Sequence, residues 1–260
     1  MRERSKPPMQ LYLARDASGA AAAARQNLVT VIVDVVDMST TLESALEAGA
    51  VAVFGASPLH HRAPVRLCPG AIGLAAGQLA RRLRTGVVVI SEPRSGTEAE
   101  RVREAGAVLA GVKEAGAEVL AVLPNLGKET PRLFPLAGQV TVAVTSSGGV
   151  AYDAAYNAGG RVTIGTVART YSGKRIVPAV RAVQRAISLA QEEDWGICVV
   201  AASGSSLEDL LAARYLLRLL AKARRANHVS LLGGIKIDRP DDRGGDKLGR
   251  WDRGTAASLP

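Results

Sequence analysis

Short apolar runs rich in β-branched residues alternate along the chain with alanine- and leucine-rich stretches whose apolar positions recur at helical spacing. This alternation is typical of parallel strands joined by crossover helices. It predicts an α/β protein with α/β/α layers and a mostly parallel or mixed sheet, and it is compatible with two similar sub-domains. Strands are expected at 29–36, 51–55, 86–91, 119–123, 139–145, 161–166 and 196–202.

Helices and loops follow from the same pattern. The helices are expected to begin near Thr40, Ile72, Thr97, Gly149, Val177 and Ser206, the last running to about Ala226. Proline, glycine and charge mark 59–69 and 124–138 as long loops. One domain is therefore predicted over 1–237, with a sub-domain joint near 124–138. The basic segment 238–260 has little apolar surface to bury and is expected to be a mobile tail.

Composition narrows the class of protein. The 260 residues are 47% apolar, enough for a sizeable core, and carry a net charge of +9. No apolar run is long enough to span a membrane, and the first ten residues lack a signal-peptide core, so a cytoplasmic location is expected. Few aromatic residues accompany the basic ones, which disfavours nucleic acid and favours a small anionic substrate. A homo-oligomer remains open.

The cysteines and histidines lack the spacing of a metal site. Cys68 and Cys198 are far apart, and the latter lies in an apolar run, so both are expected to be reduced thiols. His60 and His61 lie in an irregular loop and are expected to be exposed to solvent.

Three segments share the order of strand, small polar loop and helix: 34–45, 141–155 and 198–212. Parallel strands have their carboxyl ends on one edge, where open α/β sheets bind ligands, so these loops are expected to meet. Hydroxyls and glycines at helix amino termini suit a phosphate. The candidate phosphate-binding residues are Ser39, Thr40, Thr41, Ser146, Ser147, Gly148, Gly204 and Ser205. No loop has P-loop or dinucleotide glycine spacing, so no nucleotide cofactor is expected.

Acidic residues at two of these strand ends point to a magnesium site. Asp34 directly follows the apolar run VIV, and Glu208 and Asp209 open a helix. Hard carboxylate oxygens hold Mg²⁺, which keeps several waters and bridges to a phosphate. The sequence thus predicts Asp34, Glu208 and Asp209 as metal ligands, and Asp34, Asp37 and Asp209 as catalytic residues.

Helix capping is the competing interpretation. Three pairs fit the capping box, in which a hydroxyl and a carboxylate satisfy free N–H groups: Thr40 with Glu43, Thr97 with Glu100, and Ser205 with Glu208. Capping is preferred for the first two pairs, while for Glu208 capping and function stay equally open. For Asp34 function is preferred, because a carboxylate after VIV is costly to bury without a partner.

The segments VDVVDMSTTLESALEAGA, TVAVTSSGGVAYDAAYNAGG and VVAASGSSLEDLLAARYLLRLL, in this order, carry a family resemblance. They resemble the magnesium-dependent 2-phosphosulfolactate phosphatases over roughly residues 28 to 221, with SLEDLLAA as the most specific piece. The resemblance implies an α/β fold and hydrolysis of 2-phospho-3-sulfolactate to sulfolactate and phosphate, a step towards coenzyme M.

Two departures from that family bear on the substrate. Asp37 stands where the family pattern has an arginine, and the Gly-Glu-Arg-Gly-Gly segment of the family has only SEPRSGTE as its nearest composition. Asp37 would repel an anion unless the substrate is less anionic or another arginine, for instance Arg94 or Arg169, makes the contact.

Three functions remain open. The first is a magnesium-dependent phosphatase acting on 2-phosphosulfolactate or a related 2-phospho acid. The alternatives are a diverged protein that binds a phosphorylated metabolite without catalysis, and a phosphatase that uses Asp34 as an aspartyl nucleophile.

Overall fold

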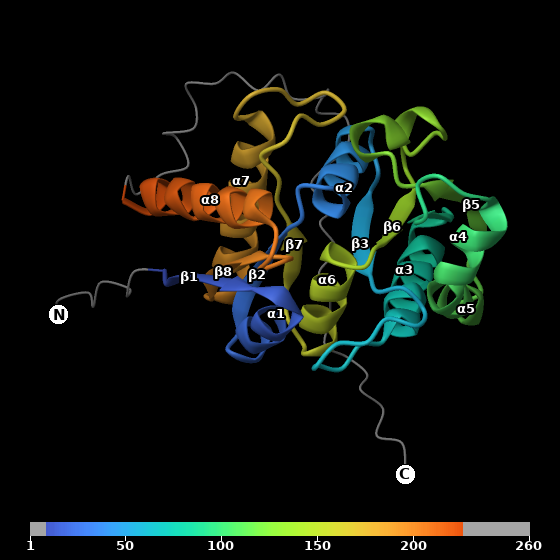
Figure 1. Cartoon of the computed structure of the whole chain (residues 1–260), viewed down its shortest axis with the longest axis horizontal. Coiled ribbons are helices and arrows are strands. Elements are labelled where there is room, and N and C mark those ends of the chain that lie inside the picture. The colour runs from blue at the N-terminus through green and yellow to red at the C-terminus, as the bar shows by residue number, and fades with distance from the viewer. Residues whose placement is uncertain (1–8, 226–260) are drawn as a thin grey trace, which may run out of the picture.

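Strands and helices alternate along residues 9–225, which the computed structural model describes (Figure 1). The expected tail at 238–260 lies outside the described residues. The strands are β1 (Leu11–Arg15), β2 (Leu28–Val33), β3 (Ala52–Ala56), β4 (Val87–Ser91), β5 (Val119–Pro124), β6 (Val140–Val144), β7 (Val162–Ile164) and β8 (Gly196–Ala201). The helices are α1 (Asp16–Arg25), α2 (Met38–Glu47), α3 (Pro69–Leu83), α4 (Glu98–Glu104), α5 (Gly106–Glu114), α6 (Gly148–Asn157), α7 (Val177–Glu193) and α8 (Leu207–Arg225), with a 3-10 helix η1 at Gly127–Arg132.

The strands form two four-stranded sheets, and every pairing in both is parallel. The first sheet has the order β1-β8-β2-β7 and the second the order β3-β6-β4-β5. The predicted α/β class is confirmed, and both sheets are entirely parallel. Segment 124–138 joins β5 to β6 and so connects two strands of the second sheet.

The chain crosses between the sheets through α2 and α6. It enters the second sheet after β2, completes all four of its strands, and returns to the first sheet after β6. Both crossing helices pack on strands of both sheets and lie between them (Figure 1). The loops that start these two helices are therefore brought to the place where the carboxyl ends of both sheets face each other.

One hydrophobic cluster joins the two sheets. It combines Ile32 and Val200 of the first sheet with Val89 and Val142 of the second, and with residues of α1, α2, α3 and α6. The other face of the first sheet is covered by α7 and α8, which pack small and branched side chains on alternate residues of β2 and β8. This alternation is why those strands are apolar throughout, as expected for parallel strands buried on both faces.

The fold differs from the sequence expectation in β1, α1, η1 and the helix expected from Thr97. The strand β1 is an edge strand with an alternately exposed pattern, and its short run LYLAR carries a weak signal. The alanine run of α1 follows it directly and buries five alanines. The stretch expected as one helix from Thr97 is two consecutive helices, α4 and α5, which meet at Ala105.

One capping box forms and two do not. Thr97 and Glu100 make the predicted reciprocal bonds at the start of α4. The box predicted for Glu43 is wrong, because this buried carboxylate forms an ion pair with Arg185 of α7. The box left open for Ser205 and Glu208 does not form, because the amide of Asp209 donates to the hydroxyl of the next residue, Ser206.

Surface features agree with several expectations. Both cysteines are free thiols, and His60 and His61 are exposed. None of the described helices combines the length and the apolar character that a membrane crossing would need.

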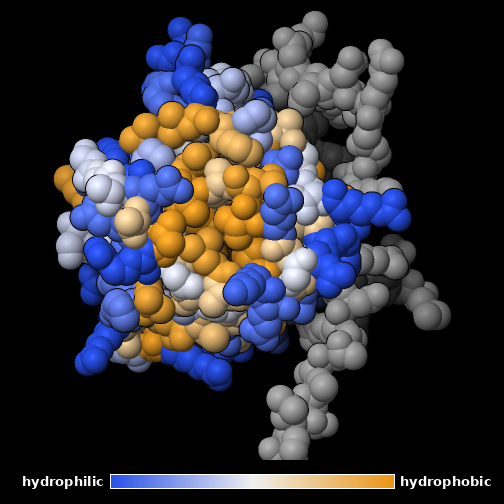
Figure 2. Space-filling model, turned by 90° about the vertical axis from the view of Figure 1, so that its right-hand side faces the viewer, coloured by the Kyte–Doolittle hydropathy of each residue, from blue (hydrophilic) through white to orange (hydrophobic). Residues whose placement is uncertain are grey.

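Figure 2, which looks onto the side that carries α5 and β5, shows a continuous apolar area bordered by polar side chains. The edge strand β5 is partly exposed along its whole length.

The contact between α3 and α5 generates a test of packing. A Cβ atom on Gly73 would lie 2.1 Å from the carbonyl oxygen of Val108, whereas one on Gly70 of the same helix would lie 3.6 Å from its nearest neighbour, the carbonyl of Ala107. Gly73→Ala should therefore lower the free energy of unfolding by roughly 1–3 kcal/mol through overpacking. Gly70→Ala, the matched control, should leave it unchanged or raise it by up to about 1 kcal/mol. Chemical denaturation measures both, and equal effects would contradict the close helix contact.

Candidate functional site

The three polar loops predicted to meet do so around Asp34, which follows β2. The Asp34 carboxylate accepts hydrogen bonds from the Ser147 hydroxyl at 3.0 Å and from the Gly148 amide at 2.8 Å, both at the start of α6. The backbone amide of the neighbouring Val35 donates to Asp209 of α8 at 2.8 Å. Hydrogen bonds thus connect the loops after β2, β6 and β8.

Asp34 occupies the position that a bound anion would take at the amino terminus of α6. It is only 1% exposed, and the helix amino terminus offers its free N–H groups to the carboxylate. Glycine is required at 148, since a Cβ there would lie 2.2 Å from the same carboxylate oxygen. Burial raises the pKa of Asp34, while the bonds from Ser147, Gly148 and the Met38 amide pull it down, with a net rise.

Asp209 and Glu208 are adjacent in sequence but differ in setting. Asp209 is buried, and its two oxygens accept from the amides of Val35 at 2.8 Å and Ser203 at 3.3 Å. The pKa of Asp209 is raised to about 6, mainly by burial. The negative charge of Asp34 also raises this pKa, whereas the two backbone hydrogen bonds lower it. Glu208 is exposed and accepts a hydrogen bond from the Ser206 hydroxyl.

The three hydroxyls after β2 are engaged with protein groups. Ser39 donates to the carbonyl of Ile32 at 2.9 Å and accepts from the Asp34 amide at 3.0 Å. Thr40 donates to the Val35 carbonyl at 2.7 Å and bonds to Thr166, and Thr41 donates to the Asn125 side chain at 2.5 Å. They are buried and fix the backbone that carries Asp34, in place of facing a phosphate.

Of the remaining candidate phosphate-binding residues, Ser146 lies in a cleft, whereas Gly204 and Ser205 make contacts within the protein. Ser146 is exposed and lines a cleft of about 750 Å³. The Gly204 amide donates to Asp16 of α1 at 2.7 Å, and the Ser205 amide donates to the Ser203 hydroxyl at 3.2 Å. These two residues shape the loop after β8 and are not among the residues that line the cleft.

The cleft brings together Arg94, which was expected from the sequence as a candidate anion contact, and residues that the sequence did not indicate, above all Glu92. Glu92, which follows β4, lines it together with Arg94, Arg103 and the pair His60 and His61. Burial raises the pKa of Glu92, and the nearby charge of Asp34 raises it further. The signal that could have found Glu92 is the same as for Asp34, an acid directly after an apolar strand, here VVVIS.

Asn125, after β5, is the second residue that sequence reasoning missed. It is fully buried, and its Oδ1 accepts from the Thr41 hydroxyl at 2.5 Å and the Gly127 amide at 3.5 Å. These two donors place its Nδ2 on the other side, where it finds no hydrogen-bond partner of good geometry among the described residues. The amide lies near enough to Glu92 to lower the pKa of that carboxyl.

Asp37 and Arg94 form an ion pair at the cleft. The Asp37 side chain is 13% exposed and the Arg94 side chain 51% exposed, so the carboxylate lies deeper and the guanidinium lies towards solvent. Arg94 lines the cleft. The charge of Asp37 is thus compensated by an arginine from the loop after β4.

The predicted magnesium ligands do not fit one ion as a set. Both oxygens of Asp209 accept backbone amides, Glu208 is turned to Ser206, and one oxygen of Asp34 is held by α6. Among residues 9–225 no group of three or more His, Cys, Asp and Glu side chains is arranged to hold a metal ion. The neighbourhood of Asp34 and Glu92 is the remaining candidate position for a magnesium ion, because Mg²⁺ needs only one or two carboxylates in addition to water and substrate oxygens.

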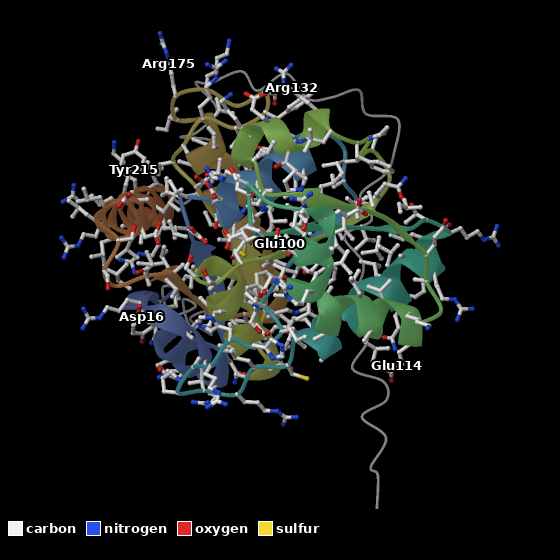
Figure 3. The ribbon with its side chains drawn as sticks, turned by 45° about the vertical axis from the view of Figure 1, so that its right-hand side comes forward. Asp16, Glu100, Glu114, Arg132, Arg175 and Tyr215 are labelled. Carbon is white, nitrogen blue, oxygen red and sulfur yellow. The ribbon has the colours of Figure 1, made fainter. Side chains whose placement is uncertain are left out.

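A second cleft lies apart from the first. It measures about 480 Å³ and is mainly apolar, with Arg175, Glu208, Leu211 and Tyr215 in its lining. Figure 3 shows that the two clefts lie apart. Glu100 of the first cleft lies near the middle of the view, while Arg175 and Tyr215 of the second cleft lie towards one side. Glu208 therefore faces a different cleft from Glu92.

The coupling between the buried acids can be measured through Asp209. Asp34→Asn should lower the pKa of Asp209 from its value of about 6, because it removes a nearby negative charge. Glu208→Gln, the control at an exposed site, should lower it less. Carbon-13 NMR titration of the carboxyl groups in chelator-treated buffer measures both shifts. A larger shift in Glu208→Gln would refute the proximity of Asp34.

The same raised pKa has a consequence for stability. The unfolded value is 3.8 and the folded value about 6, so the folded protein holds a proton that the unfolded chain releases between these pH values. The stabilisation from Asp209 is complete below about pH 4 and is lost as pH rises through 6. This part of the pH dependence should be absent in Asp209→Asn.

The comparisons with known proteins add no relative from which chemistry could be transferred. No protein-family model matches the chain, and no curated protein matches it. The function proposed below is therefore argued from the residues of the site.

Proposed function

We propose that the chain is a phosphatase that hydrolyses a small anionic phosphoester in the cleft beside Asp34 and Glu92. The observation that carries the proposal is Glu92, a carboxyl with a raised pKa on the wall of a cleft that also carries two arginines and two histidines. Acids with raised pKa values in clefts are typical of proton-transfer sites, and basic side chains attract an anion. By resemblance, 2-phosphosulfolactate and related 2-phospho acids are the first substrates to test.

Glu92 is the residue suited to transfer the proton. Burial and the charge of Asp34 raise its pKa and so favour the protonated form, which can donate its proton to the leaving oxygen as a water molecule attacks phosphorus. The Glu92 carboxylate that remains is stabilised by the neighbouring Asn125 amide and takes up the proton that the attacking water loses. The group is thereby regenerated, and the products are an alcohol and phosphate.

Asp34 has an indirect part in this scheme. Its 1% exposure and the two donors on one of its oxygens make it a poor nucleophile, which favours general acid–base chemistry over an aspartyl-phosphate intermediate. Its charge tunes the acidity of Glu92, and α6 holds it in place. Asp34 is thus a positioning residue, and Glu92 is the group that contacts the ligand.

The test is phosphate release from a panel of sulfonated and carboxylated phosphoesters. Glu92→Gln should lower kcat by about 100-fold or more, the usual contribution of a general acid. The matched control Glu208→Gln makes the same chemical change at an exposed glutamate of the other cleft and should leave kcat unchanged. Equal losses in both variants, or full activity in Glu92→Gln, would contradict the assignment.

The same panel distinguishes the remaining alternatives. Running it with added Mg²⁺ and after chelation tests the magnesium dependence expected from the sequence. Asp34→Asn should shift the pH dependence of kcat to lower pH, because the pKa of Glu92 falls when the neighbouring charge is removed. Binding of phosphoesters without turnover under every condition would favour a protein that only binds a phosphorylated metabolite.

A further inference from the structure

The ion pair between Asp37 and Arg94 is built so that a ligand can replace one of its members. Arg94 lines the cleft and is half exposed, while Asp37 is mostly covered and does not belong to the cleft lining. The guanidinium can therefore meet a ligand without leaving its loop, whereas the carboxylate acts on it from behind.

The backbone around Arg94 is fixed by its own contacts. Arg101 of α4 donates to the carbonyl oxygens of Pro93 at 3.4 Å and Gly96 at 2.9 Å. The capping box of Thr97 and Glu100 then fastens the end of the same loop to α4. Movement of Arg94 between two partners is therefore a matter of side-chain rotation.

Two other carboxylates that line the cleft have partners of their own. Glu100 is engaged with Thr97, and Glu104 lies 4.0 Å from Arg103. Asp37 is the one carboxylate that forms an ion pair with Arg94 among the described residues.

We propose that Asp37 is a built-in competitor for Arg94, which holds the guanidinium in the empty cleft and is displaced from it by the anionic group of the ligand. The proposal rests on the proposed function in using the same cleft, but it concerns binding of the anion and not hydrolysis. A phosphate group offers more charge and more acceptor oxygens to the guanidinium than one carboxylate does, and a partly exposed ion pair contributes little to stability. Asp37 would then set the affinity of the cleft for anions.

Inorganic phosphate, titrated into the full-length protein at low ionic strength, is the probe for this inference. Asp37→Asn should raise its affinity several-fold, because the competing carboxylate is removed, and Arg94→Gln should lower it by about tenfold. In the double variant the gain from Asp37→Asn should disappear, since its effect acts through Arg94. Arg94→Lys should retain part of the affinity, because it keeps the charge and loses the planar fork.

Glu129→Gln is the matched control. It removes a carboxylate that pairs with Arg132 and Lys128 on η1, outside the cleft lining, and changes the net charge by the same amount. Its phosphate affinity should equal that of the unmodified protein. Thermal unfolding of each variant without phosphate separates a binding effect from a folding effect, and Asp37 makes no side-chain cap bond on α2 that its replacement would remove.

The outcomes are distinct. A weaker affinity in Asp37→Asn would show that Asp37 orients Arg94 and does not compete for it, and would overturn the inference. Unchanged affinity in both single variants, or no phosphate binding by the unmodified protein, would also overturn it. The predicted binding pattern in a protein that hydrolyses no phosphoester would support the inference and contradict only the proposed function.

Discussion

One buried carboxylate links the end of the first sheet to the helix that follows the second. Asp34 directly follows β2, one of the two inner strands of the first sheet, and its side chain is held by the first residues of α6, which follows the second sheet. An ionised carboxylate without partners would be very costly in such a place, so the Ser147 hydroxyl and the Gly148 amide are needed for the fold as well as for the site. The close approach also explains why a residue larger than glycine is excluded at 148.

The buried charge of Asp34 also affects the pKa values of two other acids. The charge of Asp34 acts on Glu92 on one side and on Asp209 on the other, and it raises the pKa of both. The two acids differ in access, because Asp209 is enclosed by two backbone amides and Glu92 reaches the cleft. The charge of Asp34 thus favours the protonated forms of both Asp209 and Glu92. Of the two, only Glu92 lines the cleft, where a ligand can contact it.

The sequence is a good guide to features that depend on neighbours along the chain. The seven expected strands all exist, and so does the capping box of Thr97 and Glu100, because apolar runs and local caps are set by nearby residues. The meeting of the loops after β2, β6 and β8 also follows from parallel strands. The number of sheets does not follow, since it depends on where the chain crosses from one sheet to the other.

Partners distant in sequence are what the local patterns could not predict. Thr40 and Glu43 have the spacing of a capping box, but Glu43 is buried against α7, where Arg185 gives it a charged partner 142 residues away. Asn125 and Glu92 join the site only because β4 lies beside β6 and β5 lies beside β4, which places the ends of these strands near Asp34. The spacing of residue types along the sequence therefore predicts where a helix or strand ends more reliably than it predicts which groups the side chains contact.

Asp37 shows how an acidic side chain can be accommodated beside a cleft that is lined by arginines. Considered alone, its carboxylate would repel an anionic ligand from this edge of the sheets. The structure pairs it with Arg94 from the loop after β4, so the local sum of the two charges is neutral. The guanidinium that an anion needs is still present, but it comes from a different strand end and from the more exposed side of the pair. The relevant quantity for anion recognition is therefore the charge that the assembled cleft presents to solvent, and not the residue type at one position of a motif.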